Sequence, residues 1–231
     1  MNVLGIIPAR GGSVGIPRKN LAVVAGKSLL QWAIDSAKGT RLSQLVVSTN
    51  DDEIVGEAYR LGTRVVLRPD ELSQGEAVPG SSSTFRACRW HVEQMPDKPD
   101  AVMILQPTCP LRRPEDIDAA ITVMESHPGC DMVVSYTPLP GVHFNRLAEI
   151  DDDGKVEIVE DYSQFAPRQA LRPLYLRSGD IYLIRTNRLL SEQILTAMYR
   201  ARAIIIPPER HLNIDTAADL ERADRLLRAP A

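Results

Sequence analysis

A short glycine-rich loop with several basic residues follows the first predicted strand. Residues 8–20 read PARGGSVGIPRKN and come directly after the apolar run over residues 3–7. The glycines and the serine let backbone N–H groups approach an anion, and Arg10, Arg18 and Lys19 add positive charge. Ligand sites in open α/β sheets lie beyond the carboxyl ends of strands. The loop therefore predicts a site for a phosphate-rich ligand; the alternative is a flexible basic loop without a ligand.

The spacing within this loop excludes two common nucleotide motifs. A P-loop requires GxxxxGK[ST], whereas Gly15 is followed by isoleucine, proline and arginine. A dinucleotide fingerprint requires GxGxxG at the start of a helix, and this spacing does not occur in the loop. The predicted phosphate site therefore belongs to neither class.

Three further segments carry polar side chains that could do chemistry. Gln106 and Thr108 follow the fourth predicted strand, where a sheet crevice opens, although the turn could be only a rigid connector. The serines at 81–83 could supply hydroxyls to a base or ribose, or could cap the next helix. Asn213 and Asp215 point to one side of an extended segment and could hold Mg²⁺. The alternative is that they only precede the last helix, where an acidic residue suits the positive end of the helix dipole.

A run of arginines lies before the strand at residues 181–184. Arg168, Arg172 and Arg177 could bind an acidic substrate, because guanidinium groups bind carboxylates bidentately. The alternative is a solvated arm in which these arginines pair with Glu157, Glu160 and Asp161. The residues alone leave both open.

Composition indicates an ordinary globular protein. The chain has 231 residues, of which 44% are hydrophobic and 25% charged, and a net charge of −3 that argues against nucleic acid as the main partner. Its three cysteines, at 88, 109 and 130, lack metal-ligand spacing and indicate reduced thiols in a cytoplasmic protein. We find no signal-peptide pattern and no apolar stretch approaching 18 residues, so no membrane association is expected.

Short apolar runs alternate with helical patterns along the chain. The predicted strands are residues 3–7, 45–48, 64–67, 101–105, 132–135, 181–184 and 203–206. The predicted helices are residues 29–38, 51–61, 83–93, 115–124 and 217–228. Residues 50–53 and 216–219 can form capping boxes, and Pro114 suits a first helical turn. This alternation predicts an α/β fold with a doubly wound, mostly parallel sheet in one domain spanning residues 1–231.

The segment from 138 to about 176 breaks this alternation. It is rich in proline, contains the turn sequence DDDG at 151–154, and has short alternating stretches such as residues 156–159. We interpret it as a β-rich excursion inserted into the domain. Such an excursion could form a lid, a dimer arm, or both.

Together these segments resemble the acylneuraminate cytidylyltransferase family over nearly the whole chain. The most specific part is residues 7–20, which is similar to the nucleotide loop of that family, and residues 105–112 match the motif after its central strand. Residues 213–216 fall on its metal motif. The resemblance implies a Rossmann-like nucleotidyltransferase that activates a nonulosonic, sialic-type 2-keto sugar acid with CTP and Mg²⁺, for surface polysaccharide biosynthesis.

The resemblance also implies a mechanism and an assembly. The anomeric hydroxyl would attack the α-phosphate of CTP, pyrophosphate would leave, and no covalent enzyme intermediate would form. Catalysis would combine positioning with neutralisation of phosphate charge. The β-rich excursion would be the arm of a homodimer.

The resemblance assigns roles to individual residues. The catalytic residues would be Arg10, Lys19 and Asp215, and Asp215 with Asn213 would bind the metal. The nucleotide would contact Ala9, Arg10, Gly11, Gly12, Ser13, Lys19, Asn20, Arg68 and Ser82. The sugar acid would contact Gln106, Thr108, Arg146, Arg168, Gln169, Arg177, Gly179 and Tyr182.

The chain departs from the pattern of the family in three places. Val14 stands where lysine is usual, Asn213 replaces the first of two metal-binding aspartates, and Ser178 and Asp180 replace asparagine and alanine around Gly179. Two alternatives follow. One is a relative that uses another nucleotide or acid, and the other is a nucleotide-binding protein without turnover.

Overall fold

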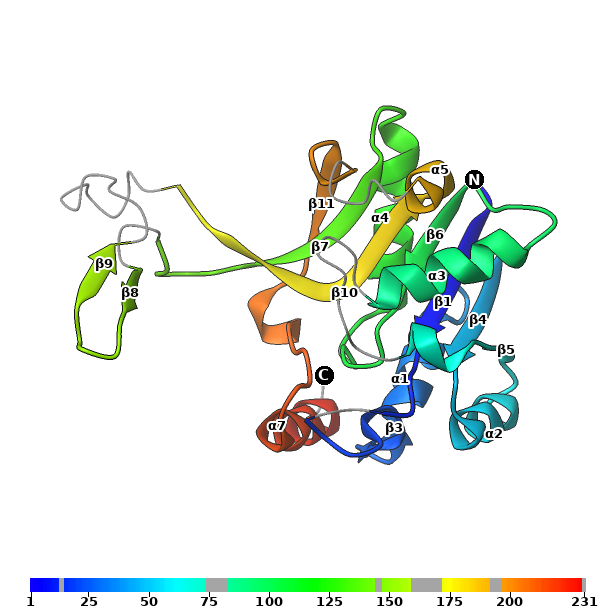
Figure 1. Ribbon diagram of the computed structural model, residues 1–231, viewed down its shortest axis with the longest axis horizontal. Coiled ribbons are helices and arrows are strands. Elements are labelled where there is room, and N and C mark those ends of the chain that lie inside the picture. The colour runs from blue at the N-terminus through cyan, green and yellow to red at the C-terminus, as the bar shows by residue number, and fades with distance from the viewer. Residues whose placement is uncertain (13–14, 74–82, 144–146, 159–171, 192–196, 230–231) are drawn as a thin grey trace.

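A seven-stranded mixed sheet organises the computed structural model (Figure 1). The structure describes residues 1–231 except 13–14, 74–82, 144–146, 159–171, 192–196 and 230–231. The sheet order is β11-β7-β10-β6-β1-β4-β5. Its strands are β1 (Val3–Pro8), β4 (Gln44–Thr49), β5 (Arg64–Leu67), β6 (Ala101–Ile104), β7 (Met132–Pro138), β10 (Tyr175–Arg185) and β11 (Ala201–Ile205). All neighbours pair in parallel except β10, which runs antiparallel to both β6 and β7.

Helices cover both faces of this sheet. Leu30 and Ile34 of one helix and Ile117 of another belong to the apolar core on one face, and Cys88 and Val92 belong to the core on the other. The helices are α1 (Leu29–Ala37), α2 (Asp52–Arg60), α3 (Ser83–Gln94), α4 (Pro114–Ser126), α5 (Thr186–Leu190) and α7 (Ala217–Arg228). Helices α1, α2 and α4 cover the first face, α3 and α5 the second, and α7 packs on a smaller cluster with Leu29.

The structure confirms the predicted fold class and the predicted strands and helices, with shifted ends. Strands β7 and β10 extend further than expected, to Pro138 and from Tyr175. The capping box at 216–219 is confirmed, because the Thr216 hydroxyl accepts from Asp219 N and Asp219 Oδ2 accepts from Thr216 N. The predicted capping box at 50–53 is wrong: Asp51 caps α2, and Asn50 Nδ2 instead donates to Asp70 Oδ1 at 2.9 Å.

Short elements complete the fold. Strands β2 (Val23–Val24) and β3 (Lys27–Ser28) form a small hairpin before α1. The 3-10 helices are η1 (Lys19–Leu21), η2 (Asp70–Leu72) and η5 (Pro208–Arg210). The described residues contain no helix long and apolar enough to cross a membrane.

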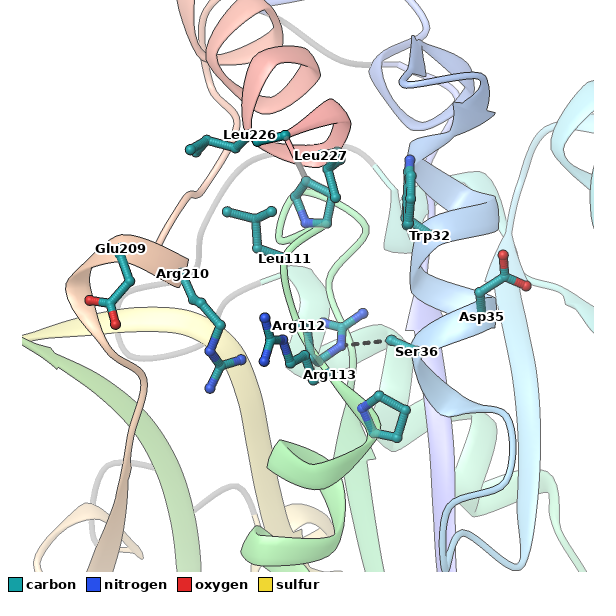
Figure 2. A pocket seen from close by; sticks show the side chains of 13 residues that line it. Trp32, Asp35, Ser36, Leu111, Arg112, Arg113, Glu209, Arg210, Leu226 and Leu227 are labelled. Carbon is teal, nitrogen blue, oxygen red and sulfur yellow. Dashed lines mark hydrogen bonds between the residues drawn. The ribbon is translucent and has the colours of Figure 1, made fainter. Parts of the chain in front are cut away.

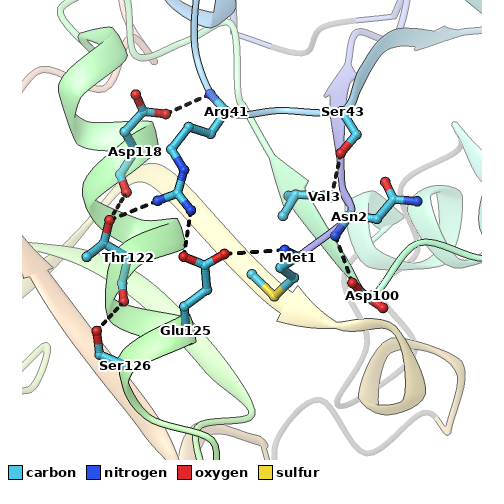
Figure 3. Close-up of polar contacts among 10 residues, drawn as sticks. All are labelled: Met1, Asn2, Val3, Arg41, Ser43, Asp100, Asp118, Thr122, Glu125 and Ser126. Atoms are coloured by element: carbon cyan, nitrogen blue, oxygen red, sulfur yellow. Dashed lines mark hydrogen bonds and ion pairs between the residues drawn. The ribbon is translucent and has the colours of Figure 1, made fainter.

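Polar contacts fix the amino ends of the central strands, at the sheet edge opposite the predicted site (Figure 3). Asn2 N donates to Asp100 Oδ2 at 2.7 Å and Val3 N donates to Ser43 Oγ at 3.2 Å, which joins the start of β1 to the segments before β6 and β4. Arg41 Nη2 pairs with Glu125 Oε2 of α4 at 2.6 Å. These contacts therefore join the amino ends of the central strands, and the residues predicted to bind a ligand lie at the carboxyl edge.

The β-rich excursion predicted at 138–176 contains the hairpin of β8 (Ala148–Ile150) and β9 (Val156–Ile158). The turn at 151–154 closes it, since Asp151 Oδ1 accepts from the N–H groups of Asp153 and Lys155. In Figure 1 the hairpin lies well away from the central sheet, beyond the extended ends of β7 and β10. Ile150 and Val156 are 68% and 58% exposed, so the hairpin presents apolar side chains to solvent.

Candidate active site

A cavity of about 460 Å³ opens at the carboxyl edge of the sheet. The ends of β1, β5 and β6 bound it together with η1, the start of α3 and the segment before α7. The lining residues are Pro8, Arg10, Gly15, Lys19, Asn20, Arg68, Ser83, Thr84, Gln106, Pro107, Thr108, Asn213 and Asp215. Segments far apart in the sequence thus meet where the strand–helix pattern predicted a ligand site.

The glycine-rich loop places two basic side chains at this cavity. Arg10 Nη1 donates to the Ser73 carbonyl oxygen at 3.3 Å, and Asn20 Nδ2 donates to the Arg10 carbonyl oxygen at 2.9 Å. Asn20 is 7% exposed, so its amide acts as an internal brace of the loop. Arg10 therefore emerges from a backbone that η1 holds in place.

Lys19 and Asp215 form an ion pair at the cavity wall. Lys19 Nζ lies 3.0 Å from Asp215 Oδ1 and donates to the Ile214 carbonyl oxygen at 2.8 Å. Asn213 Nδ2 donates to Asp215 Oδ2 at 3.3 Å, as expected for two side chains on one side of an extended segment. The Asp215 side chain is 68% exposed and the Lys19 side chain 15%, so the carboxylate faces the open side of the pair.

Arg68 forms a buried part of the cavity wall. Its Nε donates to Ser73 Oγ at 2.9 Å and its Nη1 to the Ser48 carbonyl oxygen at 3.2 Å. Burial lowers the pKa of Arg68 from its usual value, and the guanidinium nevertheless stays protonated, as arginine does in proteins. Arg68 thus brings a fixed positive charge to the carboxyl end of β5.

Arg18 does not join the other two basic residues of the loop. It adopts a left-handed backbone conformation with φ 54°, and its guanidinium turns toward α2. There it pairs with Asp51 Oδ1 at 3.3 Å and with Glu53 Oε2 at 2.7 Å. Arg10 and Lys19 therefore line the cavity, and Arg18 does not.

Gly15 makes a close backbone contact that the sequence did not indicate. A Cβ atom on Gly15 would lie 2.8 Å from the Asp215 carbonyl oxygen, a distance that real Cβ atoms do not show. Only glycine lets the loop approach the Asn213–Asp215 segment this closely. Ser83 and Thr84 also line the cavity, although helix-start serines more often act as caps.

Gln106 follows β6 and lies next to the part of β10 that was predicted to contact the acceptor, the sugar acid. Because β10 is antiparallel and Tyr182 pairs with Ile104, the residues before Tyr182 reach the same sheet edge as Gln106. A Cβ atom on Gly179 would lie 3.1 Å from Gln106 Oε1, so the two residues are neighbours. The Tyr182 ring packs edge-on against Phe85, with centroids 5.9 Å apart.

The remaining predicted residues lie elsewhere. Ala9 is fully buried and its N–H donates to the Ser48 carbonyl oxygen, Gly11 N donates to Asn50 Oδ1, and Gly12 has open space around it. Arg177 is exposed on β10 and, like Tyr182, does not line the cavity. Five predicted residues, Ser13, Ser82, Arg146, Arg168 and Gln169, lie outside the described residues.

The donor set around Asp215 fits a hard cation that shares its coordination with a ligand. The described residues contain no cluster of three or more histidine, cysteine, aspartate or glutamate side chains that could hold a metal by themselves. Mg²⁺ commonly takes one or two protein oxygens and completes its shell with phosphate and water. Asp215 and Asn213 could supply those oxygens.

A second cavity of about 500 Å³ lies between α1, η5 and α7 (Figure 2). Its wall includes Trp32, Leu111, Arg113, Arg210 and Leu227, and it contains none of the residues predicted for nucleotide, metal or acceptor. Arg210 there binds Asp116 bidentately, at 2.7 and 2.9 Å. The cavity at the carboxyl edge is therefore the candidate active site.

The site and fold define a nucleotidyltransferase. Residues 4–229 match the family model described as Cytidylyltransferase, and the chain belongs to this family. A CMP-N,N'-diacetyllegionaminic acid synthase of Legionella pneumophila is 27% identical over 98% of this chain and 97% of that protein. An N-acylneuraminate cytidylyltransferase B of Danio rerio is 30% identical over 96% of this chain, which spans 51% of that relative.

Solved structures share the fold at lower identity. A CMP:2-keto-3-deoxy-manno-octonic acid synthetase complexed with CTP superposes with a TM-score of 0.71 at 18% identity, covering 98% of both chains. A 4-diphosphocytidyl-2C-methyl-D-erythritol synthase from Anaerococcus prevotii gives a TM-score of 0.66 at 12% identity, covering 99% of this chain and 96% of that one. The Rossmann-like nucleotidyltransferase fold is thus confirmed.

Proposed function

We propose that this enzyme transfers a cytidylyl group from CTP to a nonulosonic, sialic-type 2-keto sugar acid. The observation that carries the proposal is the cavity at the carboxyl edge, where Arg10, Lys19 and Arg68 meet Gln106 and Asp215 in a chain of the cytidylyltransferase family. Three cationic side chains suit a triphosphate, and amide and hydroxyl groups on the β6 side suit a sugar.

The proposed reaction is a single displacement at phosphorus. The anomeric hydroxyl oxygen of the acid forms a bond to the α-phosphorus of CTP, and the bond from that phosphorus to the oxygen bridging to the β-phosphate breaks. Pyrophosphate leaves with the electron pair, and the hydroxyl proton passes to the medium. The protein is left to position the reactants and to stabilise charge on the phosphates.

In this scheme Lys19 and Arg10 offset the negative charge that shifts onto pyrophosphate. Lys19 is already aimed by its hydrogen bond to the Ile214 carbonyl oxygen, so little reorganisation accompanies the reaction. Arg68 is fixed by Ser73 and Ser48 and supplies a constant positive potential. Each of these charges is most valuable where the cavity wall excludes water.

Asp215 and Asn213 would hold Mg²⁺ beside the phosphates. When bound, the cation would supply further charge neutralisation on phosphate oxygens. Asp215 is the stronger of the two donors, because a carboxylate binds a hard cation better than an amide oxygen does. The Asp215 carboxylate also pairs with Lys19, so the cation and the lysine would both bind to this one carboxylate.

The acceptor class rests on the relatives. Their names specify diacetyllegionaminic acid and N-acylneuraminate, which are acidic sugars. Such an acid would bind on the β10 side of the cavity. Gln106 and Gly179 lie there, and Arg177 and Tyr182 lie on either side of Gly179 in β10. The buried, unpaired thiols of the described cysteines fit a reducing compartment, so we place the enzyme in the cytoplasm, with its product feeding surface polysaccharide synthesis.

Product analysis tests the proposal. Purified enzyme is incubated with Mg²⁺, an equimolar mixture of CTP, GTP, ATP and UTP, and one acid at a time from a panel of sialic, legionaminic, pseudaminic and eight-carbon keto acids. Mass spectrometry is expected to show one CMP-sugar with at least one nine-carbon acid. A product with another nucleotide would show a relative of different specificity, and CTP binding without any product would show a protein without turnover.

We also propose that the enzyme is a homodimer and that its arm contacts a second copy of the chain. The arm, comprising β8, β9 and the first residues of β10, exposes Ile150, Val156, Tyr175 and Leu176 by 47% or more. An apolar surface of this kind on a projecting element is typical of an interaction site. Light scattering is expected to give twice the chain mass, and Ile150→Lys with Leu176→Lys is expected to give monomers; a monomeric parent protein would overturn the proposal.

A further inference from the structure

Arg112 is a buried cation next to the active site, and neither the nucleotide, the metal nor the acceptor assignment uses it. It is 4% exposed. Its Nη1 donates to the Gln106 carbonyl oxygen at 3.1 Å and to the Asp180 carbonyl oxygen at 2.9 Å. Its Nε donates to Ser36 Oγ of α1 at 3.1 Å, the bond drawn in Figure 2. One guanidinium thus ties together the turn after β6, the bend in β10 and helix α1.

Asp180 places a carboxylate near this cation. It is 1% exposed, and neither of its carboxylate oxygens has a hydrogen-bond partner among the described residues. Burial raises the pKa of Asp180, and the nearby Ser178 hydroxyl and the positive charge of Arg112 oppose that rise. Asp116 is the other acidic residue near Arg112, and its carboxylate already accepts hydrogen bonds from Nη1 and Nη2 of Arg210. The Asp180 carboxylate therefore lies near Arg112 without a hydrogen bond to it, and the two groups interact only through their charges.

The bend in β10 also touches the acceptor side of the cavity. The register of β10 against β7 shifts between Arg177 and Tyr182, and Gly179 within this bend has φ +84°. On the β7 side, Ser135 Oγ accepts from the Ser178 hydroxyl at 2.8 Å and from Ile181 N at 2.9 Å. Ser135 and Arg112 thus hold the bend from two sides.

Gln106 is held by the same arrangement. Its carbonyl oxygen accepts from Arg112, and its side-chain oxygen lies against Gly179, where a Cβ atom would come within 3.1 Å. Displacement of Arg112 would release both the turn and the bend. Arg112 has no hydrogen bond to Arg10, Lys19 or Asp215, so its main effect is expected on the acceptor side. The turn that it holds also meets the segment before α7, where the Thr108 carbonyl oxygen accepts from Ile214 N at 2.9 Å.

We infer that Arg112, with the Asp180 carboxylate near it, is a positioning residue that sets Gln106 and the Gly179 bend for the acceptor acid. The inference rests on the proposed function, because it takes Gln106 to contact the acid.

Two near-isosteric variants test the inference. Arg112→Lys keeps the positive charge and loses the forked donor, and Asp180→Asn keeps the shape and loses the negative charge. Each is expected to raise the KM for the acid about tenfold and to leave the KM for CTP within about twofold. Arg185→Lys is the matched control: this half-buried arginine of β10 donates to the Cys130 carbonyl oxygen at 2.8 Å, at the end of β10 away from the bend, and both KM values are expected to stay within about twofold.

A coupling measurement separates positioning from general loosening. If Arg112 acts through Gln106 and the bend, adding Arg112→Lys or Asp180→Asn to Gln106→Ala raises the KM for the acid by clearly less than the same substitution does in the parent. Independent, additive effects would overturn the inference, as would equal rises in both KM values. The urea midpoint of each variant shows whether it is folded, and the Asp180→Asn arm decides if Arg112→Lys does not fold.

The parent enzyme is measured in the same series. If it forms no CMP-sugar with any acid, the proposed function fails and the inference falls with it. If it turns over and the variants keep the parental KM for the acid, the inference alone fails.

Discussion

Replacement of Lys19 by alanine should impair turnover far more than replacement of its neighbour Arg18. The two cations are adjacent in the sequence, but Lys19 lines the cavity and Arg18 pairs with Asp51 and Glu53 beside α2. Comparing Lys19→Ala with Arg18→Ala therefore compares the loss of a positive charge at the proposed phosphate site with the loss of one outside it, within the same loop.

The expected size of the effect follows from the contacts. Removing one preorganised group that stabilises transition-state charge costs about 10²–10³ in rate, or about 2.7–4 kcal/mol. Lys19→Ala should lower kcat/KM for CTP by that factor. Arg18 has a side chain that is 47% exposed, and exposed ion pairs contribute about 0.2–1 kcal/mol to stability. Arg18→Ala should leave kcat/KM within about threefold of the parent.

Stability must be measured beside activity, because Lys19 also holds the segment before α7. Its bond to the Ile214 carbonyl oxygen is a charged hydrogen bond, for which the loss is about 1.5–3 kcal/mol when buried. The ion pair between Lys19 and Asp215 contributes less to stability than this hydrogen bond, because the Asp215 side chain is exposed. A urea titration at pH 7 is expected to show Lys19→Ala folded at 25 °C with a lowered midpoint.

The assay is initial-rate pyrophosphate release at saturating Mg²⁺ and acceptor acid, with CTP varied. Two results would refute the reasoning. One is a folded Lys19→Ala enzyme with kcat/KM within threefold of the parent. The other is an Arg18→Ala enzyme as impaired as Lys19→Ala, which would mean that the loop changes conformation and brings Arg18 to the phosphates.

Three further predictions concern the segment before α7. Gly15→Ala should lower kcat/KM by about tenfold or more, because its Cβ would lie 2.8 Å from the Asp215 carbonyl oxygen; parental kinetics would disprove this contact. Asn213→Asp should lower the Mg²⁺ concentration needed for half-maximal rate, because a carboxylate is the better ligand of a hard cation; an inactive enzyme in an Mg²⁺ titration would assign Asn213 another role. Thr216→Ala should lower the free energy of unfolding by about 1 kcal/mol at pH 7, since it removes a helix cap. The Thr216 hydroxyl also donates to Asp219 Oδ2 at 2.8 Å, and this bond, with backbone N–H groups, holds the pKa of Asp219 below its usual 3.8. The part of the difference that comes from this bond is present above pH 3.8 and is lost as the pH falls through the lowered pKa. Urea titrations from pH 7 to pH 3 should therefore show the difference between the two proteins narrowing, and a difference that widens would contradict this bond.

Local patterns predicted the elements of the fold well. Buried parallel strands are continuous apolar runs and α7 has both a capping box and an apolar face, so its bounds, Ala217–Arg228, were predicted without error. The direction of β10 was not predictable from such patterns. It depends on the path of the excursion before Tyr175, which contains prolines and short alternating stretches and has no single periodicity.

Part of the site was also predictable from these local patterns. Arg10, Lys19, Gln106 and Asp215 follow predicted strands or precede a predicted helix, so topology alone brings them to one edge. The contact of Gly15 with Asp215 joins segments 200 positions apart and leaves no local signal. Arginine is usually exposed, so sequence reasoning did not indicate that Arg112 is buried, and the turn of Arg18 toward α2 depends on long-range ion pairs.

The most direct test of the central claim is pyrophosphate release by the parent enzyme with Mg²⁺ and a sialic-type keto acid, with CTP, GTP, ATP and UTP supplied one at a time. The account predicts rapid release with CTP that depends on the acid and is abolished by chelation of Mg²⁺. Release that is equally fast without the acid, or faster with another nucleotide than with CTP, would contradict it.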